Sequence, residues 1–175
     1  MLISKPKQLG FTIVELLIVI IVIAILATLV ITAYNGVQTK AKNTKTVVAV
    51  EAWVKAINLY HADTGNWPVN SCLGDSDTYD GDGICYDAAA WTVKASFVSS
   101  LRPYIGTGTL PSPDTTNVNT SSLPRRGALY MYTSGEARIY FMQSSVSSCP
   151  QIGGLAYISS SVLPGGVQYL ERLSG

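Results

Sequence analysis

One carboxylic acid, Glu15, interrupts a long apolar stretch near the start of the chain. The 23 residues from Phe11 to Ala33 contain no other charged side chain. An ionisable group inside a membrane-length segment is costly, and such groups are rare and usually functional. A buried carboxylate is tolerated when a cation or hydrogen-bond donors compensate its charge. Glu15 is therefore the first candidate functional residue.

Four aspartates cluster in one short polar segment. Asp75, Asp77, Asp80 and Asp82 lie in the run "DSDTYDGDG", and carboxylate oxygens are the ligands that Ca²⁺ prefers. The spacing is one residue out of step with a D-x-D-x-D-G calcium loop, and no glutamate follows at the expected distance. A solvated loop is the favoured interpretation, with a calcium site as the alternative.

Cys72, Cys85 and Cys149 all follow the apolar stretch, in a part of the chain that we expect outside the cytoplasm. Disulfides form in that environment. A bond between Cys72 and Cys85, which flank the aspartate segment, is the preferred pairing and leaves Cys149 free. Pairing of Cys149 with either of the other two is the alternative.

The remaining chemistry-bearing residues predict no catalytic site. His61 is the only histidine, and no nucleophile lies near it in the sequence. The net charge is +1, and Arg125–Arg126 is too small a basic cluster for a nucleic-acid surface. We therefore expect neither an enzyme nor a cofactor, calcium apart, and no nucleic-acid site.

A long helix must carry Glu15. The segment from Phe11 to Ala33 rises about 34 Å as a helix, enough to cross a bilayer core of about 30 Å. Helical character continues to Asp63, and Gly65 and Pro68 then predict the helix end. No glycine or proline occurs from Phe11 to Asn35, so we expect an unbroken helix up to Gly36.

The apolar pattern in the second half of this helix predicts that the helix is buried on more than one side. Two adjacent stripes are apolar, and so is part of the opposite face, so one domain surface covers only some of them. The first stripe is Val47, Val50, Val54 and Ile57; the second is Ala49, Trp53, Ala56 and Tyr60; the opposite side carries Val48, Ala52 and Leu59.

The rest of the chain predicts an α+β fold: a long N-terminal helix packed on a small antiparallel sheet. Residues 64–126 are rich in loop-forming residues, with one helix expected at 87–101. Alternating runs about Ser134–Gly135 predict a hairpin at 128–142, followed by a strand at 154–162 and a last one near the C-terminus. The expected segments are a leader (1–10), a membrane helix (11–34), its amphipathic continuation (35–63), the loop region (64–126) and the sheet with the C-terminal region (127–175).

The stretch "KPKQLGFTIVELLIVIIVIAILA" resembles the N-terminus of type IV pilins and of the pseudopilins of type II secretion. It has a short basic leader, Gly10, then Phe11, and Glu15 four residues later. "YHADTGNWP", at the expected helix end, is a second and weaker similarity to pseudopilins.

The resemblance implies a particular maturation and assembly. A prepilin peptidase would cut after Gly10, the new amine of Phe11 would be methylated, and Glu15 would pair with the Phe11 amine of a neighbouring subunit in a filament. Implied partners are other copies of the chain, the membrane, an assembly ATPase and a platform protein. Lys5 and Lys7 predict a precursor with its N-terminus in the cytoplasm and its domain outside.

Three alternatives to a major pilin remain open at this point. The chain resembles minor pilins and type II secretion pseudopilins as well. From another class, a membrane-anchored binding domain that never polymerises would share the apolar helix. The exposed side of the helix distinguishes these classes, because a monomer should not expose Val48, Ala52 and Leu59 as well as the core stripe.

Overall fold

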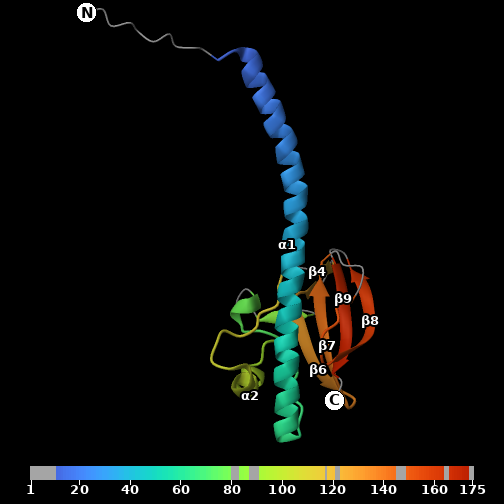
Figure 1. Ribbon diagram of the computed structural model, residues 1–175. Helices are drawn as coiled ribbons and strands as arrows, with labels where there is room; N and C mark the ends of the chain where they lie inside the picture. The colour runs from blue at the N-terminus through green and yellow to red at the C-terminus, as the bar shows by residue number, and fades with distance from the viewer. Residues whose placement is uncertain are drawn as a thin grey trace, which may run out of the picture. The chain divides into compact units, whose positions relative to one another are not determined.

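The computed structural model describes residues 11–79, 83–86, 91–116, 118–120, 123–144, 149–163 and 166–173. It divides into two compact units, Met1–Gln38 and Thr39–Gly175. The first unit holds the apolar part of helix α1 (Ile13–Thr64), and the second holds the rest of that helix and all the other elements (Figure 1). The α+β class expected from the sequence is confirmed.

Helix α1 has 52 residues and is helical at Gly36, as expected. Its C-terminal end is set by Gly65, whose φ of +70° favours glycine, and whose N–H donates to the carbonyl of His61 (2.8 Å). Pro68 follows three residues later. The end of the helix therefore lies within one residue of its expected position.

A five-stranded antiparallel sheet packs against α1 within the second unit (Figure 1). Its order is β1 (Ser71–Cys72), β6 (Ala128–Thr133), β7 (Glu136–Gln143), β9 (Gly166–Leu173) and β8 (Leu155–Leu163). β6 and β7 form the expected hairpin about Ser134–Gly135, both with positive φ. The two expected C-terminal strands are also present, with β8 at the edge.

A second, smaller sheet occupies the region that the sequence predicts as loops. Its order is β3 (Trp91–Thr92), β2 (Ile84–Tyr86), β5 (Leu123–Arg125) and β4 (Val118–Thr120), and a short 3-10 helix, η1 (Asp77–Tyr79), precedes it. Strands of two or three residues are too short to show the alternation by which strands are recognised.

The helix expected at 87–101 is wrong in its position. Helix α2 runs from Ala95 to Ile105, while Trp91 lies in β3 and pairs with Tyr86 of β2. Trp91 packs against a buried group that we call the disulfide cluster (Cys72, Tyr79, Cys85 and Leu129). These tertiary contacts outweigh the helical spacing of the apolar residues around Trp91. The helix also continues past Pro103, where only one backbone hydrogen bond is lost and Tyr104 and Ile105 pack on the core.

The main core lies between α1, α2 and the five-stranded sheet. Trp53 of α1 stacks on Phe97 of α2, which in turn stacks on Tyr130 of β6. Both helix stripes expected to be buried face this core, with Val47 and Tyr60 only partly covered. The fully buried α1 residues are Val50, Trp53, Ala56 and Ile57, with Ala49 and Val54 nearly so.

Candidate functional site

Glu15 and Thr12 form a reciprocal hydrogen-bonded cap at the first turn of α1. The backbone N–H and the hydroxyl of Thr12 both donate to Oε2 of Glu15, at 2.8 and 2.7 Å. The N–H of Glu15 donates to the Thr12 hydroxyl (3.2 Å). This is the capping box, in which two unpaired N–H groups at a helix start are satisfied by side chains.

The cap uses only one oxygen of the Glu15 carboxylate. Within the described part of the chain, no donor bonds to Oε1, and Glu15 is exposed. The positive end of the helix dipole favours a negative charge at this turn. The arrangement thus presents a fixed, ionisable carboxylate with a free oxygen at the start of an apolar helix.

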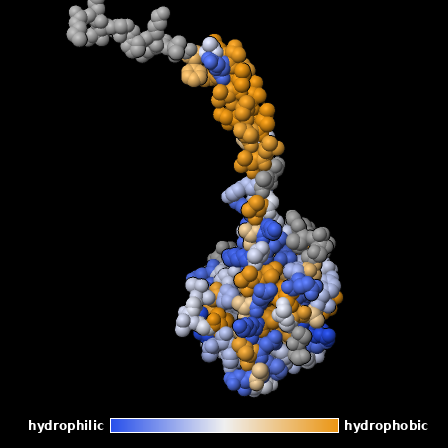
Figure 2. All heavy atoms as spheres, viewed as in Figure 1, coloured by the Kyte–Doolittle hydropathy of each residue, from blue (hydrophilic) through white to orange (hydrophobic). Residues whose placement is uncertain are grey.

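The apolar helix around this carboxylate is uncovered. Figure 2 shows an almost continuous hydrophobic surface over the N-terminal part of α1. Large apolar side chains from Ile13 to Ile31 are about half or more exposed. Among the described helices, α1 contains the one stretch long and apolar enough to cross a membrane. These properties suit a helix that inserts into a bilayer or packs against other helices.

The exposed side of the second half of α1 agrees with the sequence expectation. Val48 is 57% exposed and Leu59 is 44% exposed, and Ala52 is partly buried. An open groove along this side is lined by Glu51, Val54, Lys55, Asn58, Leu59 and Gly153. Apolar helix surface therefore remains uncovered beside the domain core.

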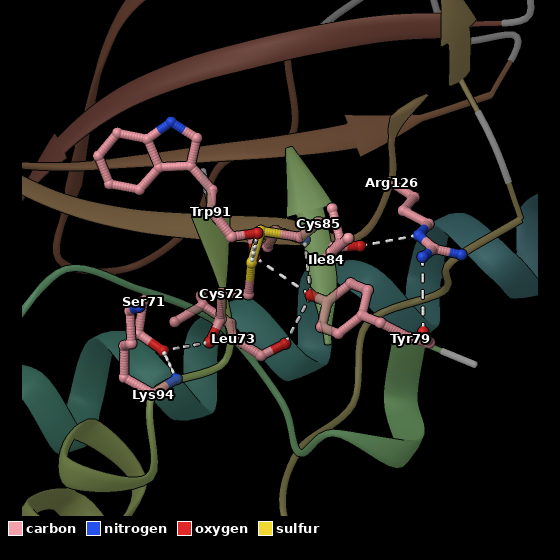
Figure 3. The surroundings of a disulfide bond; sticks show 10 residues. Ser71, Cys72, Leu73, Tyr79, Ile84, Cys85, Trp91, Lys94 and Arg126 are labelled. Atoms are coloured by element: carbon pink, nitrogen blue, oxygen red, sulfur yellow. Dashed lines mark hydrogen bonds between the residues drawn. A yellow bond between two sulfur atoms is a disulfide. The ribbon is translucent and has the colours of Figure 1, made fainter. Parts of the chain in front are cut away.

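The disulfide joins Cys72 and Cys85, the preferred pairing, with Cα atoms 5.7 Å apart. It links β1 of the large sheet to β2 of the small one (Figure 3). Buried Tyr79 packs against it and donates to the carbonyl of Leu73 (2.7 Å). Cys149 is free and partly buried. The bond therefore ties the two sheets together.

The aspartate segment is described only in part. Asp75 accepts hydrogen bonds from the N–H and hydroxyl of Thr78, both at 2.8 Å, which caps η1. Asp77 lies in η1 and is exposed. Asp80 and Asp82 lie outside the described residues, so the calcium site stays a prediction. No group of three or more His, Cys, Asp or Glu side chains that could hold a metal occurs among the residues described.

Gly10 also lies outside the described residues, and Phe11 is exposed at the start of the described chain. His61 stacks on Trp67 with ring centroids 3.9 Å apart, at the end of α1. Of the two arginines, Arg126 donates to the carbonyl of Ile84 (2.8 Å) and Arg125 lies over the Tyr86 ring. Both arginines therefore take part in the small sheet's structure.

Sequence reasoning missed Thr12. The signal was present, because T-x-x-E directly before an apolar helical run is the capping-box pattern. It also missed Glu171, a buried acid in β9 beside Cys149, although strand alternation places Glu171 on the same face as Tyr169 and Leu173.

Comparison with known proteins supports the resemblance inferred from the sequence. Residues 5–31 match the family described as the prokaryotic N-terminal methylation motif. The chain is 29% identical to a fimbrial protein of Neisseria meningitidis over 63% of its own length. It is 34% identical to the type IV major pilin protein PilE1 of Neisseria gonorrhoeae over 37% of its length. It is also 35% identical to the type II secretion system core protein G of Escherichia coli over 39%.

These matches cover 59%, 39% and 47% of the three relatives. The chain therefore spans well under two thirds of the proteins that it matches. No solved structure matches it. The chain carries an N-terminal methylation motif, and its relatives are type IV pilins and a type II secretion pseudopilin.

Proposed function

We propose that this chain is a structural subunit of a type IV pilus-like filament that polymerises through α1. Cleavage after Gly10 would free the α-amine of Phe11, and a free α-amine is largely cationic at neutral pH. The observation that carries the proposal is the Glu15 carboxylate, fixed by Thr12 and keeping one oxygen free at the start of an uncovered apolar helix.

In this account, Glu15 receives the Phe11 amine of an incoming subunit. An amine that entered an apolar bundle without a partner would be a buried, uncompensated charge, which is strongly destabilising. Pairing at one position along the helix therefore selects the axial register between subunits. Methylation of Phe11 keeps the amine basic and so preserves the pairing.

The implied partners follow from this function. A prepilin peptidase would process the leader, and an assembly ATPase and a platform protein would drive polymerisation. Lys5 and Lys7 favour a precursor that keeps its N-terminus in the cytoplasm and its domain on the outer side. The similarity to fimbrial proteins and to core protein G leaves major pilin, minor pilin and pseudopilin as variants of one function.

A membrane-anchored binding domain that never polymerises is less well supported. Such a monomer gains nothing from the exposed Val48 and Leu59 beside the core. The exposed side of α1 gives other subunits a surface to pack on.

The test separates the charge of Glu15 from its capping role. In Glu15→Gln, the amide oxygen still accepts from Thr12, as glutamine does in capping boxes, but the charge is gone. We expect Glu15→Gln and Glu15→Ala to lose surface fibres, counted by electron microscopy, with normal protein levels in the membrane fraction. Glu15→Asp should give an intermediate number. Normal fibre numbers from Glu15→Gln would reduce Glu15 to a helix cap and contradict the docking role.

A further inference from the structure

Three lysines lie close together in the middle of α1. Lys40, Lys42 and Lys45 are the only charged side chains between Glu15 and Glu51. Lys40 and Lys45 are exposed and Lys42 is partly buried. In the part of the chain that the structure describes, none of them forms an ion pair. We call these three residues the lysine cluster.

The side of the helix that lies between these lysines packs against the rest of the domain. Asn43 Nδ2 donates to the carbonyl of Ser144 (2.7 Å), and the Ser144 N–H donates back to Asn43 Oδ1 (2.9 Å). Thr46 is buried, and its hydroxyl accepts from the N–H of Asp114 (3.1 Å). These contacts fix α1 to the domain at the level of the lysine cluster and leave the exposed lysines facing outward.

The helix rise places the lysine cluster at the edge of a bilayer. Counted from Phe11, a hydrocarbon core of about 30 Å ends near Ile31, and Tyr34 follows about 35 Å along the helix. Tyr34 is 60% exposed, and tyrosine is enriched at membrane interfaces. Lys40 lies about 44 Å along, and helical side chains lean towards the N-terminus, so its ammonium group reaches back towards the headgroups.

We propose that the lysine cluster binds the anionic headgroups of the outer leaflet while the subunit is held in the membrane. Lys40 and Lys42 make the closest contacts, and Lys45 lies about 5 to 8 Å further out. The site would hold the unassembled subunit at a fixed depth in the membrane. It rests on the membrane placement in the proposed function, but not on polymerisation.

Asp114, whose backbone N–H bonds to Thr46, does not compete for this role. Its carboxylate accepts from both the N–H and the hydroxyl of Thr116. The other candidate partner is an acidic residue of a neighbouring subunit. Pairing of Phe11 with Glu15 offsets neighbouring helices by four residues, so Lys40 and Lys42 lie level with a stretch of the neighbouring helix that contains no acid, and its Glu51 lies nearer the level of Lys45. Lipid phosphate is therefore the favoured partner.

The first experiment measures lysine reactivity in vesicles. The full-length chain is reconstituted in phosphatidylcholine alone or with about one third phosphatidylglycerol, and a neutral amine reagent labels it for peptide mass spectrometry. We expect anionic lipid to slow the labelling of Lys40 and Lys42 about fivefold, the factor that corresponds to about 1 kcal/mol per lysine. Exposed Lys55 and Lys94 are internal controls and should not change. High salt should remove the protection.

The second experiment measures lipid retained by the chain after mild detergent extraction, by native mass spectrometry. The wild-type chain should retain several-fold more phosphatidylglycerol than phosphatidylcholine. The variant K40Q/K42Q/K45Q should lose this preference, while the matched variant K55Q/K94Q should keep it. Equal lipid retention by wild type and K40Q/K42Q/K45Q, with loss of fibres in that variant, would overturn the proposal in favour of a subunit contact.

Vesicle flotation separates this proposal from the proposed function. A chain that fails to float with vesicles would contradict the membrane placement itself. A chain that floats but shows the same Lys40 labelling in both lipid mixtures would contradict only the headgroup site.

Discussion

The thiol of Cys149 donates a hydrogen bond to Oε1 of Glu171 at 2.7 Å, on the core side of strand β9. Glu171 is only 2% exposed and lies between buried Tyr169 and Leu173 on the same face. Burial raises the pKa of Glu171, and the hydrogen bond from Cys149 opposes this only in part. Burial and the neighbouring carboxyl raise the pKa of Cys149 to about 12.

Glu171 should make the folded state lose stability as pH rises. Its folded pKa is above its unfolded value, so the folded chain binds the proton more tightly. Its contribution is therefore greatest below about pH 4, the unfolded pKa, and declines as pH rises through the folded pKa. We expect the free energy of unfolding of wild type, relative to Glu171→Gln, to fall as pH rises above about 4, measured by urea unfolding in detergent.

Glu136→Gln is the control of opposite sign. Hydrogen bonds from Arg138 and Arg172 lower the pKa of Glu136, so its contribution is present above the unfolded pKa and is lost as pH falls. If the stability of wild type relative to Glu171→Gln instead rises with pH, the pKa of Glu171 is not raised in the folded chain.

The Cys72–Cys85 bond should stabilise the domain by about 3 kcal/mol in the chain-entropy model for a 13-residue separation. We expect C72S/C85S to lower the free energy of unfolding by that amount, while Cys149→Ser has a much smaller effect. Non-reducing peptide mapping should recover a linked peptide with Cys72 and Cys85. A main species linked through Cys149 would contradict this pairing.

Gly127→Ala should be much more destabilising than Gly135→Ala. Both glycines have positive φ, +66° and +81°, so alanine is strained at either position by about 1 kcal/mol or more. A Cβ at Gly127 would lie 2.6 Å from the hydroxyl of buried Tyr79, whereas Gly135 has open space around it. Thermal unfolding of the two variants checks the difference. Equal losses of stability in the two variants would mean that the Tyr79 side chain moves away from residue 127 at little cost.

Thr12→Val should weaken the helix start without abolishing assembly. It removes the capping hydroxyl but keeps the Glu15 charge, and loss of such a cap costs about 1 kcal/mol. We expect fewer fibres than wild type but many more than Glu15→Ala gives, and Thr12→Ser should restore the number. Complete loss of fibres in Thr12→Val, with the protein still in the membrane, would show that the cap is what assembly requires.

The long elements of the fold could be predicted from the sequence, while the short ones could not. The length of α1, the buried faces of Trp53 and Val50 and the hairpin at Ser134 all follow from periodicity or turn chemistry. The small sheet depends on contacts between segments far apart in the chain, such as Tyr86 with Arg125. Local propensity therefore placed Trp91 in a helix, although its packing against the disulfide cluster puts it in a strand.

The candidate site was predicted in its charge but not in its geometry. The cost of a carboxylate in an apolar segment singled out Glu15, and the flanking positions of Cys72 and Cys85 favoured their pairing. The reciprocal bonds with Thr12 show in addition that one Glu15 oxygen is occupied and the other is free. The residue types alone could not predict that one carboxylate oxygen is bonded and the other is free.

The mass of the subunits in purified surface fibres tests the central claim most directly. Fibres sheared from cells would be examined by electron microscopy and dissociated for intact-mass and N-terminal peptide analysis. The account predicts a chain that begins with Phe11, carries one added methyl group on its amine and contains the Cys72–Cys85 bond. Fibres that lack this chain, or a chain that retains Met1 and stays in the membrane, would contradict it.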